Sequence, residues 1–184
     1  DVLFTAVDWW KAKPDGTLEL NATTGKPDDN GTVLFMTFDQ RNLTGIIEDY
    51  SINNNTGTIV GAKFTNDSAM GLGALKFDGK STFVNTSNIS TIDLTIEAWI
   101  SLVDGNDGGI YTISQRNGVA TDWDFYFDGR AASGGPRFEI DYGGFNRVVS
   151  NSITPVANQW YHIAVTAIDG TSNGKMCING GDET

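Results

Sequence analysis

The sequence has one cysteine, Cys177, and one histidine, His162. A single cysteine excludes an internal disulfide and any Cys-based zinc site, and a single histidine excludes a multi-His zinc site. No stretch approaches the ~20 apolar residues of a membrane-spanning helix. Only 12 residues are Lys or Arg against 23 Asp or Glu, and the formal net charge of −11 argues against a nucleic-acid partner.

The length of 184 residues fits one domain that buries roughly two-thirds of its unfolded surface. The chain begins at Asp1, with neither Met nor the apolar core of a signal peptide. We therefore expect a mature or trimmed form of the protein.

Asn-x-Ser/Thr sequons are more frequent than the roughly two or three that this composition would give by chance. All lie in the first half of the chain, in loop-like sequence. They begin at Asn21, Asn30, Asn42, Asn54, Asn66, Asn85 and Asn88. An Asn- and Thr-rich sequence forms sequons freely, but the pattern also favours a glycosylated extracellular protein.

From Val33 onward, short apolar runs alternate with turn sequences such as Asp78-Gly79 and Asn117-Gly118. The predicted strand segments are 33–38, 58–64, 74–84, 94–102, 109–114, 123–127, 137–142, 147–150, 160–168 and 175–178. No segment shows a sustained 3.6-residue period, so few or no helices are expected. Many short strands without helices predict an all-β sandwich or jelly roll.

Two segments alternate clearly between apolar and polar residues. In 95–102 the apolar positions are Ile96, Ala98, Ile100 and Leu102, and the other face carries Glu97 and Trp99. In 160–167 the apolar face carries Tyr161, Ile163, Val165 and Ala167, and the other carries Trp160 and His162. Each strand is thus predicted to give one face to the core between the sheets.

Several segments follow one another in a distinctive order: VLFMTFD (33–39), EDYSINNNTGTIVGA (48–62), ALKFDG (74–79), LTIEAWI (94–100), NQWYHIAVT (158–166) and ING (178–180). Their order resembles the laminin-G-like jelly roll of the concanavalin-A-like lectin/glucanase superfamily. The resemblance covers about residues 33–180 and implies an all-β, antiparallel two-sheet jelly-roll sandwich over residues 33–184. Residues 1–32, an apolar strand-like segment followed by a polar linker, have no counterpart in the family pattern.

The closing strand usual in the family has no match before Thr184. The apolar start, residues 2–10, alternates like a strand and is a candidate to fill such a gap. It can do so within its own chain or in a neighbouring copy, as in donor-strand complementation. A trimmed chain explains the missing strand equally well.

The sequence lacks most of the groups that a catalytic site would need. The glucanases of the superfamily carry an E-x-D-x-E strand, whereas this chain has Glu139, Asp141 and then Gly143 where the general acid belongs. Without that acid we expect no hydrolase activity. The lone His162, on the same predicted face as Glu97, is expected to form a structural hydrogen bond or ion pair.

Among metal ions, the sequence favours calcium over zinc, because acidic Asn/Asp/Gly loops supply the oxygen ligands that calcium prefers. The resemblance points to the loop 49–55, and oxygen-rich turns come next; solvated turns are the alternative explanation. The candidate ligands are Asp49, Ser51, Asn53, Asn55, Asp78, Asp104 and Asp107.

Sugar binding needs aromatic platforms and planar polar groups, and both types are dense between residues 123 and 147. The candidate ligand-binding residues are Trp123, Tyr126, Arg130, Arg137, Tyr142 and Arg147. Core packing and cross-strand pairing are the alternative explanation for the same residues.

Together these features predict a non-enzymatic extracellular recognition or adhesion module for glycans or a surface protein. The alternative is a glycosylated structural subunit of a filament, pilus or fibre. Such a subunit would bind copies of itself through residues 2–10.

Overall fold

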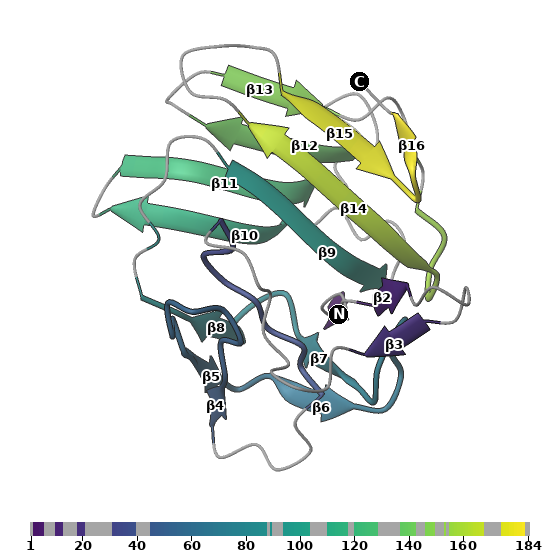
Figure 1. Ribbon diagram of the computed structural model, residues 1–184. Helices are drawn as coiled ribbons and strands as arrows, with labels where there is room; N and C mark the ends of the chain where they lie inside the picture. The colour runs from purple at the N-terminus through teal and green to yellow at the C-terminus, as the bar shows by residue number, and fades with distance from the viewer. Residues whose placement is uncertain are drawn as a thin grey trace.

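The computed structural model consists of strands, turns and connecting segments, with no helix among the residues that it describes (Figure 1). The described residues are 2–5, 10–12, 18–20, 31–39, 45–87, 89, 94–103, 110–117, 120–128, 137–142, 146–149, 153, 155–167 and 174–182. All the strand pairings are antiparallel. The all-β prediction is confirmed.

The larger sheet has seven strands drawn from all parts of the chain. They are β1 (Val2–Thr5), β6 (Lys63–Thr65), β7 (Ala74–Phe77), β9 (Leu94–Leu102), β14 (Trp160–Ala167), β15 (Lys175–Ile178) and β16 (Gly181–Asp182). Their order across the sheet is β16-β15-β14-β9-β1-β7-β6. Strands β9 and β14 form its long centre, in which His162 lies opposite Trp99.

A four-stranded sheet packs behind β9, β14 and β15 (Figure 1). It runs in the order β10-β11-β12-β13. These strands are β10 (Ile110–Asn117), β11 (Ala120–Asp128), β12 (Arg137–Tyr142) and β13 (Asn146–Val149). Smaller sheets are formed by β2 (Trp10–Ala12) with β3 (Leu18–Leu20), and by β4 (Ile46–Ile47), β5 (Gly57–Val60) and β8 (Phe83–Asn85).

The main core lies between these two larger sheets, because each contributes alternate apolar side chains to it. Its buried members are Ala98, Ile100, Leu102, Phe125, Phe127, Phe138, Ile140, Tyr161, Ile163, Val165, Met176 and Ile178. The ring centroids of Phe127 and Phe138 are 5.2 Å apart. The apolar faces predicted for 95–102 and 160–166 therefore point into the core, with Ile96 packed against it.

A second apolar cluster lies beside the three-stranded sheet, formed by Met36, Ile47 and Leu75. Here one prediction is wrong, since residues 33–38 form no strand. The backbone N–H of Phe35 donates instead to the Asp49 carboxylate at 2.8 Å. The Phe35 carbonyl accepts from Tyr50 N–H at 2.7 Å. A side chain thus takes the place of a neighbouring strand.

Two predicted strands are each divided in the structure. Segment 58–64 breaks between β5 and β6 at Gly61, whose φ is +70°. Segment 74–84 breaks between β7 and β8 at a turn that contains Asp78 and Gly79, whose φ is +66°. Glycine accepts this left-handed conformation at little cost, so the chain can leave one sheet and enter another.

Strand β1 lies inside the larger sheet of its own chain. Val2 to Phe4 pair with Phe77 to Leu75 of β7, and Val2 to Thr5 pair with Leu102 to Trp99 of β9. The predicted domain boundary at residue 32 stays a prediction. Strand β1 lies before this boundary, but it pairs with β7 and β9, which lie after it. Exchange of this strand between copies also stays a prediction.

Candidate functional site

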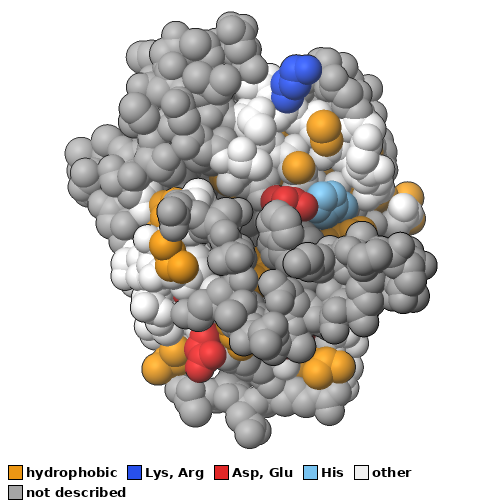
Figure 2. Space-filling model, in the orientation of Figure 1, with side chains coloured by type: hydrophobic (Ala, Val, Ile, Leu, Met, Phe, Trp, Pro, Cys, Tyr) orange, Lys and Arg blue, Asp and Glu red, His pale blue; other side chains and the backbone are white. Residues whose placement is uncertain are grey.

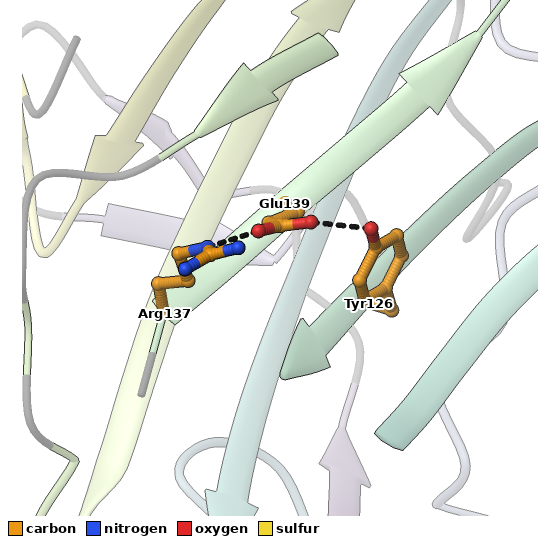
Figure 3. A network of polar contacts seen from close by, with 3 residues as sticks. All are labelled: Tyr126, Arg137 and Glu139. Carbon is orange, nitrogen blue, oxygen red and sulfur yellow. Dashed lines mark hydrogen bonds and ion pairs between the residues drawn. The ribbon is translucent and has the colours of Figure 1, made fainter. Parts of the chain in front are cut away.

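A polar network lies on the side of the four-stranded sheet that faces away from the core (Figure 3). Tyr126 of β11 and Glu139 of β12 are register partners. Phe125, Phe127, Phe138 and Ile140 fill the core from the same two strands, so the intervening residues face the other way. Tyr126 Oη donates to one oxygen of Glu139, and Arg137 Nε donates to the other.

Glu139 is buried, at 1% exposure, whereas the Arg137 side chain keeps 15%. A carboxylate removed from water is costly unless a cation and hydrogen bonds compensate it. Arg137 and Tyr126 supply both, and they hold the carboxylate in a fixed orientation. The guanidinium carries further N–H donors beyond Nε, in a plane that suits paired oxygen acceptors.

The structure brings together two of the six residues predicted to bind sugar, Tyr126 and Arg137, with Glu139 between them. Trp123 and Tyr142 are register partners of each other on β11 and β12. Arg147 pairs in register with Asp141. Arg130 lies outside the described residues.

The sequence had marked Glu139 only as part of an incomplete catalytic strand. Its role beside Tyr126 was missed, because cross-strand register is not visible in one sequence. The two-residue spacing between Arg137 and Glu139 was the available signal, since it puts both side chains on one face of a strand.

The loop predicted to bind calcium is organised around the carboxylate of Asp49. Its Oδ1 accepts from the N–H groups of Phe35 and Ser51, each at 2.8 Å. Its Oδ2 accepts from Ser51 Oγ and Asn55 N–H, each at 2.7 Å. The amide groups of Asn53 and Asn55 donate to the carbonyls of Thr32 and Val33, at 3.0 and 2.9 Å.

Burial raises the pKa of the Asp49 carboxyl, but the hydrogen bonds from Ser51, Phe35 and Asn55 outweigh that effect. The net result is a pKa below the usual 3.8 of an aspartate, so Asp49 is ionised at neutral pH. The four predicted ligands do lie in one loop. A calcium ion there would have to displace N–H and O–H donors from both carboxylate oxygens, so calcium binding stays a prediction.

Asp78 organises the exposed turn between β7 and β8. Its Oδ1 accepts from the N–H groups of Lys80, Ser81 and Thr82 at 2.9 to 3.0 Å. The N–H groups of Ser81 and Lys80 hold the pKa of this carboxyl far below its usual range. Asp104 and Asp107 lie outside the described residues. Within the described residues, no group of three His, Cys, Asp or Glu side chains is placed to share a metal ion.

The larger sheet also carries a polar pair on the side away from the core. His162 Nε2 and Glu97 Oε1 are 2.7 Å apart, which confirms the expected structural contact. Trp99 lies beside His162 with the ring centroids 5.0 Å apart. The single histidine is visible beside an acidic side chain on this face (Figure 2). Trp99 Nε1 and Ser101 Oγ are buried with no hydrogen-bond partner within the part of the chain described.

Three sequon asparagines lie among the described residues, and all three are exposed: Asn54, Asn66 and Asn85. Asn54 precedes β5 and Asn85 ends β8, so both belong to the three-stranded sheet region. Asn66 follows β6. Asn21, Asn30, Asn42 and Asn88 lie outside the described residues.

Comparison with protein families gives a match over residues 76–183, to the model of the concanavalin A-like lectin/glucanases superfamily. The chain belongs to this superfamily. The match starts at Lys76 in β7 and reaches past β16, so it includes the whole four-stranded sheet and strands β9, β14, β15 and β16 of the larger sheet. The resemblance and the jelly-roll class predicted from the sequence are confirmed. Comparisons with curated proteins and with solved structures give no significant match.

Membership of the concanavalin A-like lectin/glucanases superfamily indicates a module that binds carbohydrates or other ligands. Some members of the superfamily are glycosidases, and laminin-G-like members are typically not enzymes. None of the described residues forms a helix long and apolar enough to cross a lipid bilayer.

Proposed function

We propose that the chain is a non-enzymatic extracellular recognition module that binds glycans on the outward face of β10–β13. The observation that carries the proposal is the Tyr126–Glu139–Arg137 network (Figure 3). Glycan hydroxyl groups are recognised by carboxylate and guanidinium groups held in a fixed geometry. In the network both groups lie on β12. The buried Glu139, which is also bound by Tyr126 of the adjacent β11, fixes the Arg137 guanidinium, and the 15% exposed Arg137 side chain has further N–H groups to donate to a glycan hydroxyl.

We propose no hydrolytic role for Glu139. Retaining glycosidases need a nucleophile and an acid about 5 Å apart, and inverting ones need a similar pair with room for water. Glu139 is already bound to Arg137 and Tyr126. Gly143 occupies the sequence position of the acid, so the strand lacks the group that would protonate a leaving oxygen.

A glycan array probed with the whole chain tests this function directly. Arg137→Lys keeps the charge but removes the planar fork, and Tyr126→Phe removes only the hydroxyl group. We expect each to weaken binding to the best glycan by about tenfold or more, in line with roughly 1.5–3 kcal/mol for a hydrogen bond to a charged group. Lys175→Ala is the matched control, because Lys175 is an exposed cation on β15 of the other sheet.

Each variant is first shown by circular dichroism to be folded at the assay temperature, well below its melting temperature, so that a loss of binding is not a loss of folding. Equal binding by wild type, Arg137→Lys and Tyr126→Phe would place the ligand elsewhere. No binding to any glycan, with the protein folded, would contradict glycan recognition itself.

The position of β1 favours a second function, a structural subunit that assembles through strand exchange. This four-residue strand comes from the start of the chain and lies between β7 and β9. A strand held there in one copy can be held there in the next, since the main-chain pairing is the same. Light scattering with intact mass measurement distinguishes the two functions. A monomer near 19.8 kDa supports the module, and a polymer supports the subunit.

A further inference from the structure

The three-stranded sheet β4-β5-β8 has one buried face and one exposed apolar face. On the buried face, Ile47 is 1% exposed and Gly57 lies against Met36, whose Cε would be 3.0 Å from a Cβ at Gly57. On the other face, Ile46, Val60 and Phe83 are 47%, 39% and 51% exposed. Hydrophobic side chains also show at the surface in this part of Figure 2. A large exposed ring in such a group indicates a surface that something covers.

Strand register puts a sequon asparagine on this same face. Val60 pairs with Phe83, and Thr58 pairs with Asn85. Phe83 and Asn85 are two residues apart on β8 and both are exposed, so their side chains leave the strand on one side, roughly 6–7 Å apart. Among the described residues, no hydrogen bond engages the Asn85 side chain.

We propose that Asn85, in the sequon Asn85-Thr86-Ser87, carries an N-linked glycan whose first sugar packs on the ring of Phe83. The N-glycosidic bond forms between Asn85 Nδ2 and the anomeric carbon of a lipid-diphosphate-linked oligosaccharide. The amide loses a proton, and the lipid diphosphate leaves with the bonding electron pair. The C–H face of a pyranose is apolar, so it covers an aromatic ring as an apolar side chain would.

A second sequon with the same spacing provides an internal contrast. Phe64 stands two residues before Asn66, as Phe83 stands before Asn85. The Phe64 ring, however, lies over Gly73, where an added Cβ would be 2.1 Å from Cζ. Phe64 is partly buried there, whereas Phe83 is 51% exposed. The sequence treats the two sites alike, and only the structure leaves one aromatic ring open to a sugar.

The test uses the whole chain expressed in eukaryotic cells that attach N-linked glycans, with glycopeptide mass spectrometry to locate them. We expect Asn85 to be occupied. Ser87→Ala removes the sequon hydroxyl and leaves Asn85 and Phe83 in place. Loss of the glycan should lower the melting temperature by roughly 2–4 °C, the shift for a modest stabilisation in a protein of this size.

A double-mutant cycle then tests the packing on Phe83. Phe83→Ala should lower the melting temperature in the glycosylated protein but have little effect in the Ser87→Ala background. Phe83→Trp should preserve the coupling. For comparison, Phe64→Ala should destabilise equally with and without Ser68→Ala, which removes the Asn66 sequon.

Two results would overturn the proposal: an unmodified Asn85 in the glycosylating host, or an equal effect of Phe83→Ala in both backgrounds. Neither result bears on the glycan-recognition face, because Arg137 and Tyr126 belong to another sheet.

Discussion

The Asp49 carboxylate accepts a hydrogen bond from the backbone N–H of Phe35, 14 residues earlier, at 2.8 Å. The same carboxylate also accepts from Ser51 and Asn55, so one side chain joins Phe35 to the loop before β5. A buried carboxylate with this many donors is a structural centre. Its loss should be felt well beyond the loop.

Asp49→Asn is expected to lower the free energy of unfolding by about 2–4 kcal/mol. The amide would place an N–H₂ group against donors that now meet an oxygen, and the charge that strengthens these bonds would be lost. Urea denaturation measures the change. The neighbouring Glu48→Gln is the control, because Glu48 is exposed, and we expect a change within about 0.5 kcal/mol. Equal effects of the two substitutions would contradict the role of Asp49.

The same residue predicts a pH dependence of stability. The pKa of Asp49 is lowered below 3.8 in the folded protein, so the unfolded chain takes up the proton first as the pH falls. Its contribution is complete above the unfolded value and is lost as the pH falls below about 3.8 towards the folded value. Urea denaturation of wild type and Asp49→Asn between pH 7 and pH 2 should show their difference shrinking in that window. A difference that is constant with pH would refute this linkage.

Two glycines with similar φ angles allow the cost of backbone strain to be measured separately from the cost of a steric clash. Gly71 has φ +71°, and a Cβ there would lie 2.4 Å from Asp39 Oδ1. Gly45 has φ +82° and nothing within 4 Å of its added Cβ. We expect Gly45→Ala to cost about 1 kcal/mol from the backbone alone and Gly71→Ala about 1–2 kcal/mol more.

The added cost at Gly71 arises because Asp39 also accepts the N–H groups of Leu72 and Gly73, at 2.6 and 3.1 Å. Thermal denaturation of the two variants measures the difference between them. If Gly45→Ala is the more harmful of the two, the Asp39 contact does not control this turn.

Glu139→Gln is expected to cost about 2–4 kcal/mol of stability, because it leaves Arg137 without its charge partner in a buried setting. Glu97→Gln is the matched substitution in the other sheet. Glu97 is 46% exposed beside His162, so solvent screens the pair and we expect a change below about 1 kcal/mol. Guanidinium denaturation compares both with wild type. Similar small changes would mean that the Glu139 network contributes little to the fold.

Deletion of residues 1–5 removes β1 and leaves β7 and β9 without their shared neighbour. We expect the shortened protein to aggregate or lose its cooperative unfolding transition, because unpaired strand edges invite association. A synthetic peptide of residues 1–12 added in trans should restore the transition. If the shortened protein folds like the wild type without the peptide, β1 is not needed for the fold, and the strand-exchange function is contradicted as well.

Much of the fold could be predicted from the sequence, because a half-buried strand must alternate apolar and polar residues. Segments 94–102, 137–142 and 175–178 begin and end as predicted. Segment 33–38 has the composition of a strand but is not one, because Asp49 supplies the hydrogen-bond acceptor that a neighbouring strand would have supplied. Local sequence cannot reveal that competition, since the partner lies 14 residues away.

The candidate site could be predicted from the sequence only in part. Tyr126 and Arg137 were expected to contribute to a ligand surface, and the structure brings them together on one carboxylate. Glu139, to which both are bound, was not in the predicted group. The register of β11 and β12 pairs it with Tyr126, and a single sequence does not show that register.

The sequence by itself determined the all-β class, the apolar faces that form the core and the superfamily, because these follow from local alternation and segment order. The tertiary structure decided which polar groups are hydrogen-bonded and which aromatic rings are exposed. Asp49 holds a loop, Glu139 joins two strands, and Phe64 is partly buried whereas Phe83 is exposed. Those outcomes depend on pairings between residues far apart in the chain. Such pairings are set by packing and register, and no single segment encodes them.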